Sequence, residues 1–418
     1  MERSSLSRRY LEEFVCKANE VVFFKLIASV RDLDEDVERN TFAPEFCHQV
    51  FGDSESVFGY RDLKIRLFYT ACRLIRYVNV SYTETIDVNR SEGVEPDDVI
   101  AIIKEKVGGT FISNLDTFAA ALEQESNFTP FGDLLNVFTV DDKQVMKDGN
   151  EATVKRIFEI YKADPSDKGF LNYHEQMQTF LLWFIDAASY IDVDDDKWDF
   201  FVIYEKNVAN GIPNGKDHSN SYPVYHFVGY MTVYRYYAYP ENTRPRISQV
   251  LVLPPFQKKG IGVKLLETAY NHYRAQKSVV DITVEDPSDN FVRLRDFVDA
   301  KNCMKLNSYQ PEMLARGWSE EMGTEAREKL KISKRQARRI YEILKLRMVD
   351  KSNPEEYRNY RLEIKNRLNA PFSKFKRFGL TASEKNMREM RYEELTMLYN
   401  QLEEDYQRVI ERLAMHND

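Results

Sequence analysis

Hydrophobic positions divide the chain into three stretches with different periodicities. In the first stretch, apolar runs typical of β-strands and amphipathic helical patterns cover residues 21–30 and 63–83 (strands) and 96–107 and 114–124 (helices). Turn-forming residues at 127–133 close this stretch. We therefore expect a first domain, residues 1–135, of the α/β class.

The second stretch, residues 136–300, alternates strands and helices. Strand-like runs lie at residues 153–163, 198–206, 224–239, 247–253 and 279–284, and helical patterns at 172–191, after Gly260 and at 289–300. The two strands joined through the helix after Gly260 must be parallel, whereas the strands upstream are joined by loops and are expected to be antiparallel. The polar segment 207–223 is expected to be an exposed loop. The pattern therefore predicts an α/β (α+β) domain with a mixed central sheet.

The third stretch, residues 301–418, is helical throughout and predicts a helical C-terminal region. Within it, residues 331–377 carry 15 Lys and Arg against 5 Asp and Glu. Such a basic segment is compatible with nucleic-acid binding, but no recognised DNA- or RNA-binding motif accompanies it. We interpret it as a helix whose basic flank faces solvent or a partner protein, and we expect no direct contact with nucleic acid.

Composition and charge narrow the class of protein. The chain has 418 residues and a net charge of −8, which predicts two or three folded domains and no general affinity for nucleic acid. Residues 1–318 hold 37 Lys and Arg against 49 Asp and Glu, a balance that suits a cationic partner or simply solubility. The four cysteines lack C-x-x-C spacing, and we find no secretory signal or membrane-spanning run. We therefore expect an intracellular protein with no metal site, disulfide framework or membrane partner.

The segment with the clearest chemistry is residues 250–267, VLVLPPFQKKGIGVKLLE. A Walker loop requires G-x-x-x-x-G-K-[ST], but Gly262 is followed by Val263. A Rossmann fingerprint requires a third glycine where Leu265 stands, and further strand–helix units where the chain becomes all helical. What the segment does contain is Q-x-x-G-x-G, from Gln257 to Gly262.

The physical properties of this loop suit a pyrophosphate. Pro254 and Pro255 end the preceding strand because they cannot donate to a β-ladder. Gly260 and Gly262 allow successive amide N–H groups to point into one concavity, which the N-terminus of the following helix also faces. The predicted phosphate-binding residues are Gln257, Lys258, Lys259, Gly260, Ile261, Gly262 and Val263. The helix is expected to bury Leu265, Leu266, Ala269 and Tyr273.

This loop, at the start of a helix in an α/β domain, resembles the acetyl-coenzyme A loop of the GNAT acetyltransferase superfamily. Further segments narrow the likeness: YKAD, QTFLLWFIDAASYIDVDDDKW, VGYMTVYRYYAYP, RPRISQVLVLPPFQ, VEDPSDNFVRLRDF, ARRIYEIL and, near the N-terminus, HQVFGDSESVFGY. Together they resemble the type B histone acetyltransferase catalytic subunits over nearly the whole chain. The resemblance implies a GNAT-type central sheet and acetyl-coenzyme A as cofactor. The loop at 207–223 is longer than the family leads us to expect.

Acetylation of a lysine requires a base. Deprotonating an ammonium group with a pKa of ~10.4 at pH 7 costs roughly 4.6 kcal/mol, and a positioned carboxylate can accept the proton. Glu285 stands at the carboxyl end of the strand VVDITV, where an α/β sheet opens into its cleft, on the same face as Asp281. The resemblance likewise implies Glu285 as general base, with Asp286 as alternate. Asp286 and Ser288 are also placed to cap the next helix.

Asp186 is a second candidate for the base. It interrupts an apolar helix, which is costly unless the carboxylate is paired or functional. No cysteine stands in a nucleophile motif and no Ser-His-Asp set can be read from the sequence, so direct attack of the amine on the thioester in a ternary complex is the simplest mechanism. The resemblance implies that the backbone of Val250, Leu251 and Val252 guides the thioester and stabilises the developing oxyanion. We count Ser288 among the cofactor-binding residues as well.

A basic peptide needs acids to attract it and aromatic rings to line the methylenes of its lysine. Residues 191–200, IDVDDDKWDF, supply acids. An EF-hand calcium loop is excluded there, because Lys197 occupies the position of the required glycine and Ile203 that of the final glutamate. A solvated turn is the plainer interpretation of this segment. The resemblance points to a histone-facing set of Asp53, Glu55, Tyr173, Trp198, Tyr234 and Tyr236. For any single tyrosine, core packing explains its presence equally well.

These observations and the resemblance predict a lysine N-acetyltransferase that uses acetyl-coenzyme A, and the resemblance implies that it acts on histone tails, in particular free histone four. The resemblance also implies a WD-repeat histone chaperone as partner and a location in cytoplasm and nucleus. One alternative is a GNAT enzyme for another amine. The other is a histone-binding module with a vestigial site, against which the intact Gln257, Gly260, Gly262 and Glu285 argue.

Overall fold

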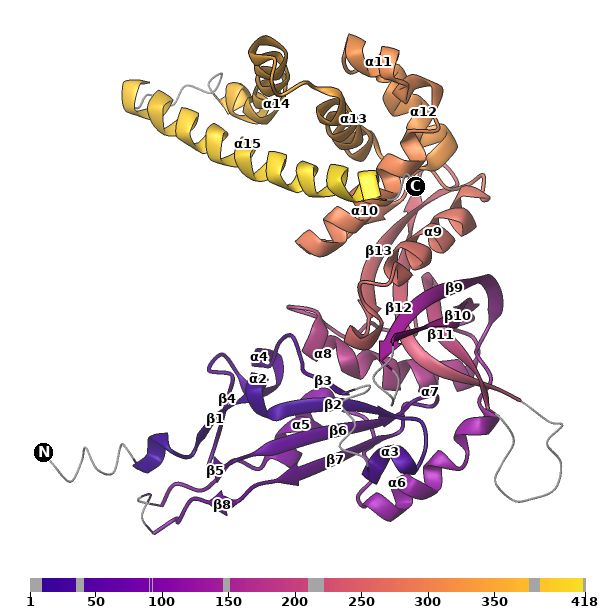
Figure 1. Ribbon diagram of the computed structural model, residues 1–418, viewed down its shortest axis with the longest axis vertical. Helices are drawn as coiled ribbons and strands as arrows, with labels where there is room; N and C mark the ends of the chain where they lie inside the picture. The colour runs from indigo at the N-terminus through magenta and orange to yellow at the C-terminus, as the bar shows by residue number, and fades with distance from the viewer. Residues whose placement is uncertain are drawn as a thin grey trace, which may run out of the picture. The chain divides into compact units, whose positions relative to one another are not determined.

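A computed structural model of the chain describes residues 10–34, 41–89, 91, 93–145, 151–209, 222–375 and 384–415 (Figure 1). It divides into two compact units. The first unit consists of residues 1–234 and 249–261, and the second of residues 235–248 and 262–418. The two units are defined by contacts between residues and do not test the predicted domain boundaries near residues 135 and 300, which stay a prediction. In the described part of the chain, no helix is both long enough and apolar enough to cross a membrane.

The N-terminal part of the first unit contains short strands and helices. The strands are β1 (Val15–Lys17), β2 (Val22–Ile27), β3 (Thr41–Phe42), β4 (Ser56–Phe58), β5 (Tyr60–Arg61), β6 (Lys64–Thr70), β7 (Arg76–Ser81) and β8 (Glu84–Thr85). The helices are α2 (Ala18–Val21), α3 (Arg31–Asp34), α4 (His48–Phe51), α5 (Val99–Val107), α6 (Leu115–Leu122) and the 3₁₀ helix η1 (Glu125–Asn127). The predicted strands at 21–30 and 63–83 and both predicted helices are therefore present.

An aromatic core covers one face of the four-stranded sheet, whose order is β3-β2-β6-β7. β2 and β6 pair in parallel at its centre. The ring of Phe24 on β2 packs against five others at centroid distances of 5.4 to 6.0 Å: Phe42, Tyr69, Phe180, Trp183 and Phe184. Because Phe180, Trp183 and Phe184 come from the segment after residue 168, burial of these rings fixes that segment against the N-terminal sheet.

A six-stranded sheet follows in the order β14-β13-β12-β11-β10-β9. Its elements are β9 (Asp133–Val145), β10 (Glu151–Ala163), α7 (Lys168–Met177), η2 (Gln178–Phe180), α8 (Leu181–Phe184), β11 (Trp198–Ala209), β12 (Tyr222–Ala238), β13 (Asn242–Val252), η3 (Pro254–Phe256), α9 (Ile261–Arg274) and β14 (Thr283–Val284). The strands from β9 to β12 pair antiparallel, and β13 pairs with β14 in parallel. The predicted mixed sheet is thus confirmed.

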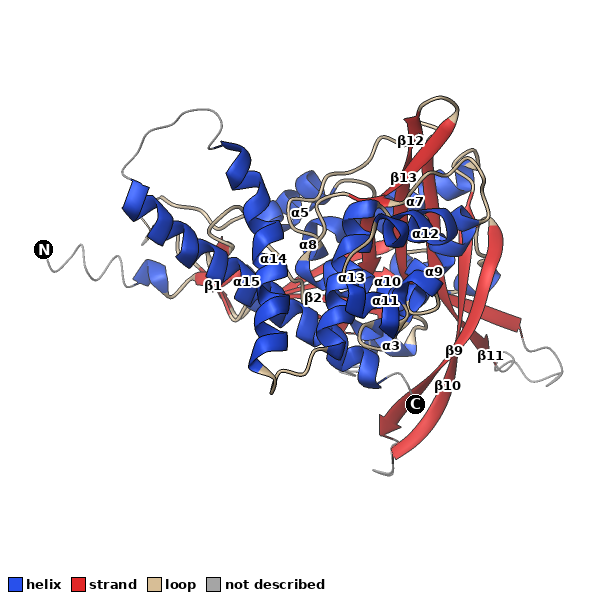
Figure 2. Cartoon of the chain, turned by 90° about the horizontal axis from the view of Figure 1, so that it is seen from above, coloured by secondary structure: helices blue, strands red, loops and turns tan. Residues whose placement is uncertain are grey.

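Four strands of this region differ from expectation. β9, which runs beside β10 as a long twisted pair in Figure 2, was not predicted, because its Leu134, Leu135 and Val137 are exposed on an edge strand without alternation. β11 and β12 extend into the predicted loop 207–223, of which residues 210–221 lie outside the described residues. β14 has only two residues.

The predicted single helix at 172–191 is wrong. α7 ends at Met177, and after η2 and α8 the backbone becomes extended at Ile185, with φ −130° and ψ 118°. Asp186 therefore lies beyond the helix, where its side chain is 67% exposed. It does not interrupt an apolar helix, and burial places no cost on its carboxylate.

The remaining described residues of the second unit are helical, apart from an isolated bridge at Ile332. They form α10 (Asp289–Cys303), η4 (Asn307–Tyr309), α11 (Pro311–Arg316), α12 (Glu320–Leu330), α13 (Lys334–Met348), α14 (Pro354–Phe375) and α15 (Glu384–Met415). The prediction of a helical C-terminal region is confirmed.

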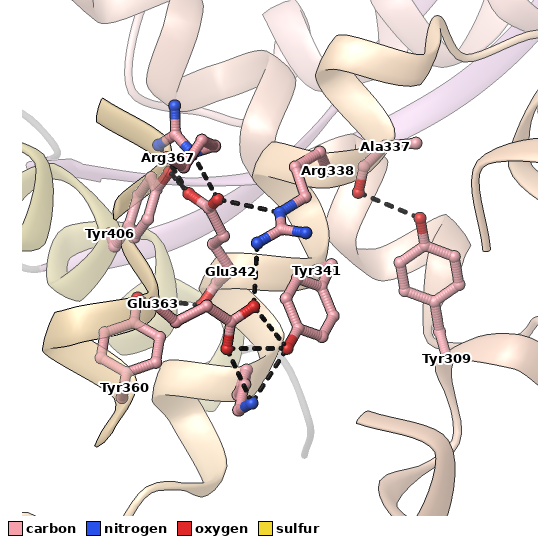
Figure 3. A network of polar contacts seen from close by, with 10 residues as sticks. Tyr309, Ala337, Arg338, Tyr341, Glu342, Tyr360, Glu363, Arg367 and Tyr406 are labelled. Atoms are coloured by element: carbon pink, nitrogen blue, oxygen red, sulfur yellow. Dashed lines mark hydrogen bonds and ion pairs between the residues drawn. The ribbon is translucent and has the colours of Figure 1, made fainter. Parts of the chain in front are cut away.

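The basic helix α13 packs inside this bundle, which corrects its interpretation as a solvated or partner-facing helix. Glu342 on α13 is fully buried, and its carboxylate accepts hydrogen bonds from Arg338, Arg367 on α14 and Tyr406 on α15 (Figure 3). Glu363 on α14 accepts from Arg338, Tyr341 and Lys345. Much of the positive charge on α13 is therefore neutralised within the unit rather than presented to a partner.

Candidate active site

The loop between β13 and α9 has the backbone geometry of an anion cradle. Lys258 and Gly260 have φ values of 60° and 80° on either side of Lys259, and such alternation turns neighbouring N–H groups to one side. A Cβ placed on Gly260 would meet no atom within 4 Å, so glycine is needed here for its conformation, and the space beside it is open. α9 has no acidic residue in its first turn to repel an anion. These residues fit the pyrophosphate of acetyl-coenzyme A.

The end of β13 is joined to this loop by a side chain. Nε2 of Gln257 donates to the carbonyl of Val252 at 2.8 Å, which closes the turn around the double proline. On the neighbouring strand, a Cβ at Gly229 would lie 2.2 Å from the carbonyl oxygen of Leu251, so β12 approaches residues 251–252 more closely than any other amino acid would allow. Residues 250–252, which were predicted to guide the thioester, are thus held in place by Gln257 and by the close approach of β12.

Lys259 does not extend freely toward a ligand. Its Nζ lies 2.7 and 2.6 Å from the two carboxylate oxygens of Asp142 on β9, which also accepts from Arg156 at 3.0 Å. Burial alone would raise the pKa of Asp142, but the hydrogen bonds from Lys259 and Arg156 bring that pKa below its ordinary value. Sequence reasoning missed Asp142, and Lys259 acts here first as an anchor of the loop.

The first turns of α9 pack tightly in the second unit. Leu265, Leu266, Ala269 and Tyr273 are buried as predicted. A Cβ at Gly262 would lie 2.9 Å from Cδ1 of Leu294 on α10, so this glycine permits close helix packing, whereas Gly260 supplies a left-handed turn. The two glycines of the motif therefore have different physical roles.

Glu285 follows β14 directly and is attached to β13 at three points. Its amide donates to the carbonyl of Ile247 at 2.9 Å, and its carboxylate accepts from Oγ of Ser248 at 3.1 Å. Nη1 of Arg246 lies 3.8 Å from the other carboxylate oxygen. The side chain remains 44% exposed, so it is accessible to a substrate.

The other two predicted residues of this segment are placed differently. Asp286 is exposed and has a φ of 29°. Ser288 is the N-cap of α10, and its hydroxyl accepts from the amide of Phe291 at 3.3 Å, as the capping alternative predicted. Cofactor contact by Ser288 stays a prediction.

The predicted histone-facing aromatic residues separate into a surface group and a core residue. Trp198 packs edge-on against Tyr234 at 5.0 Å, and the Tyr234 hydroxyl donates to Asp195 at 2.7 Å. Tyr236 is 41% exposed. Tyr173 is only 5% exposed and donates to the carbonyl of Cys72 at 2.9 Å, which is the placement of a core residue.

Among the acids, Asp186 and Glu55 are brought together by a residue that sequence reasoning missed. Nε2 of His48 lies 3.2 Å from Asp186, and its Nδ1 lies 3.6 Å from Glu55. Glu55 also accepts from the amides of Cys47 and His48, so it fixes the start of α4, while Asp53 is exposed. No group of three or more potential ligands in the described residues could hold a metal ion.

Some of the missed residues carried a signal in the sequence. Arg246 and Ser248 alternate on the strand that leads to residues 250–252, and the parallel pairing to β14 requires that strand to run beside Glu285. His48 and Asp142 carried none, because their partners are distant in the sequence.

Comparison with known proteins finds three family models that match successive parts of the chain. Residues 14–186 match the family model "Histone acetyl transferase HAT1 N-terminus", residues 157–294 match "Acetyltransferase (GNAT) family", and residues 295–346 match "Histone acetyltransferase type B catalytic subunit, C-terminal". The histone acetyltransferase type B catalytic subunits of Mus musculus and Homo sapiens are each 43% identical over 427 residues, which cover 99% of this chain and 98% and 97% of theirs.

A relative of lower sequence identity also matches over nearly the whole chain. The histone acetyltransferase type B catalytic subunit of Cryptococcus neoformans var. neoformans is 31% identical over 425 residues, 96% of this chain and 98% of its own. The loop, the mixed sheet and these full-length matches lead to one conclusion. The chain is an acetyltransferase with a GNAT domain and belongs to the family of histone acetyltransferase type B catalytic subunits.

Proposed function

We propose that the chain transfers the acetyl group of acetyl-coenzyme A directly to the ε-amine of a lysine in the tail of free histone four, with Glu285 as general base. The observation that supports this most strongly is the carboxylate of Glu285, which is accessible yet attached to β13 through its amide and through Ser248. A base in a fixed position can accept the ammonium proton, whose removal at pH 7 costs roughly 4.6 kcal/mol.

The backbone of the loop and the start of α9 bind and orient the cofactor. The amides of residues 258–263 would hold its pyrophosphate, with the side chain of Gln257 closing the loop, and an N–H of residues 250–252 would stabilise negative charge on the thioester oxygen. When bound, acetyl-coenzyme A supplies an activated acyl thioester. The lysine nitrogen would form a bond to the acetyl carbon as the carbon–sulfur bond breaks, and coenzyme A would leave as the thiolate, balanced by the proton that the new amide nitrogen loses.

The cysteines support direct transfer over an acetyl-cysteine intermediate. Burial raises the pKa of Cys16, and burial followed by the charge of Glu55 raises the pKa of Cys47 to about 12. Burial likewise raises the pKa of Cys72 and Cys303. None of these four thiols is therefore a thiolate near neutral pH, and the thiolate is the nucleophilic form.

The substrate, partner and location follow the same proposal. Exposed acids at Asp53, Asp186 and Asp192 in the first unit suit a basic tail, and Trp198 in the first unit and Tyr236 in the second each offer an aromatic ring. Relatives that cover the full chain are named as catalytic subunits, which supports a second subunit, and we propose a WD-repeat histone chaperone. Work on free histones implies residence in both cytoplasm and nucleus.

The proposal is tested by mixing the protein with labelled acetyl-coenzyme A and a histone four tail peptide. We expect transfer by the wild type and a loss of about 10²–10⁴ in kcat for Glu285→Gln, the usual contribution of a general base. Asp286→Asn is the neighbouring control, and we expect it to retain most activity. Full turnover by Glu285→Gln at neutral pH would remove Glu285 as base.

Two further measurements separate the alternatives. Transfer to a small polyamine in preference to the peptide would indicate a GNAT enzyme for another amine, and peptide binding without any transfer would indicate a vestigial site. Intact-mass measurement after mixing with acetyl-coenzyme A alone should find no acetylated protein, because direct transfer needs the lysine substrate.

A further inference from the structure

The side chain of Arg246 on β13 lies between an aromatic ring and the proposed base. Its guanidinium carbon is 4.7 Å from the centroid of the Tyr236 ring, and its Nη1 is 3.8 Å from a carboxylate oxygen of Glu285. The other carboxylate oxygen accepts from Ser248. One strand therefore positions both oxygens of Glu285.

The strand register explains why these groups meet. Arg246 and Ser248 are two residues apart and point to the same face, whereas Ile247 between them is 1% exposed. Parallel pairing joins Arg246 to Thr283 and Ile247 to Val284, so the next residue, Glu285, extends along the face that carries Arg246 and Ser248. Stacking on Tyr236 limits the positions that the long arginine side chain can adopt.

Stability does not account for this arrangement. The side chains of Arg246 and Glu285 are 39% and 44% exposed, and ion pairs between such exposed groups contribute little to folding. A cation beside the base has a direct effect on the reaction, however. The guanidinium lies 3.8 Å from one carboxylate oxygen and, together with Ser248 at the other, limits the orientations from which Glu285 can accept the lysine proton.

We propose that Arg246, oriented by Tyr236, and Ser248 are positioning residues that act through Glu285 to favour loss of the lysine proton. The proposal rests on the proposed function, because it requires Glu285 to be the base. The arginine does not touch the reacting atoms: it fixes one carboxylate oxygen, and Ser248 fixes the other.

Arg246→Gln should therefore lower kcat while leaving the KM for acetyl-coenzyme A unchanged. We expect a loss of roughly tenfold in kcat, because a carboxylate that is no longer held in place spends less time where it can accept the proton. Arg246→Lys should recover part of the loss, since it restores the charge but not the flat stacking on Tyr236. Ser248→Ala should also lower kcat.

The matched control is a second ion pair on β13, formed by the arginine two residues before Arg246. Arg244 pairs with Asp281, with Nε 2.5 Å from Oδ1, but Asp281 is buried and lies outside the proposed mechanism. The double variant Arg244→Gln/Asp281→Asn removes a cation from β13 without leaving an unpaired buried acid, and we expect wild-type kcat. Thermal unfolding of every variant verifies that it is folded.

A double-mutant cycle with Glu285→Gln decides whether Arg246 acts through the base. We expect Arg246→Gln to cause no further loss in that background. An equal loss in both backgrounds, or wild-type kcat for Arg246→Gln alone, would overturn the inference while leaving Glu285 as base. Full activity of Glu285→Gln itself would overturn the proposed function, and this inference with it.

Discussion

His174 on α7 is a buried histidine whose two ring nitrogens have no hydrogen-bond partner among the described residues. Its ring lies 4.8 Å from that of Phe200 and 6.1 Å from that of Tyr230. Burial lowers its pKa to about 4 from an ordinary value of 6.5. The native state therefore holds the neutral imidazole, and protonation favours unfolding.

This difference predicts how stability depends on pH. The contribution is fully present above pH 6.5, where the unfolded histidine is also neutral, and it is lost as the pH falls from 6.5 toward 4. By pH 5 the loss reaches about 2 kcal/mol. His174→Phe should remove that part of the acid sensitivity. Urea unfolding of both proteins at pH 8 and 5 measures it, and an equal loss in both would contradict the assignment to His174.

At the residue scale, the sequence indicates which residues carry reactive or ligand-binding groups more readily than it indicates which side chains contact them. Gly260 and Glu285 could be identified because a motif and a strand end constrain them. Asp142 and His48 could not, since their contacts are with side chains that only the fold brings near. Tyr173 illustrates the opposite case, in which a candidate chosen by residue type is not at the surface. A tyrosine suits a substrate-binding surface, but the structure buries Tyr173 against Phe128 and Phe131.

Among the elements, the loop before α9 depends on two glycines with different functions. Gly260 has a φ of 80° and open space beside it, whereas Gly262 lies against Leu294. Substitution should therefore affect ligand binding at the first position and helix packing at the second.

Gly260→Ala should weaken acetyl-coenzyme A binding about five- to thirtyfold, because a left-handed conformation costs a non-glycine residue roughly 1–2 kcal/mol. The global unfolding midpoint should change little. Gly262→Ala is the companion variant: the Leu294 side chain must move, so stability should fall more than affinity. Calorimetric titration and thermal unfolding distinguish the two, and unchanged affinity in Gly260→Ala would argue against the cradle.

Elements with a regular spacing of hydrophobic residues could be predicted from the sequence, whereas the strand at the edge of the sheet could not. The antiparallel strands and α9 follow from alternation and helical spacing, and both are present. β9 pairs on one side only, so its exposed leucines and valine give no alternating signal. The helix at 172–191 breaks after Met177, where packing of Phe180, Trp183 and Phe184 around Phe24 overrides the continuous apolar pattern.

At the scale of the whole molecule, the charge that a segment exposes depends on which of its side chains are paired inside the fold, as well as on its composition. The basic segment 331–377 suggested an exposed surface, yet Glu342 and Glu363 take up three of its cations inside the bundle. Composition cannot reveal this, because it does not say which acids lie between which helices.

Glu342→Gln should lower the free energy of unfolding by about 3 kcal/mol, since it leaves Arg338 and Arg367 without their buried acid. We take the lower end of the usual range because Arg367 is 38% exposed. Glu404→Gln breaks an exposed pair with Arg408 on α15 and should cost no more than about 0.5 kcal/mol. Equal effects in urea unfolding would mean that the buried carboxylate does not stabilise the bundle.

The amide of Glu285 donates to Ile247 on the neighbouring strand. An amide proton in such a bond exchanges with deuterated water only when the strand end opens. Its exchange rate therefore measures, without substrate and without turnover, what fraction of the time the base is out of position. A variant that speeds this exchange while leaving β10 and β11 protected would separate a displaced base from a damaged fold.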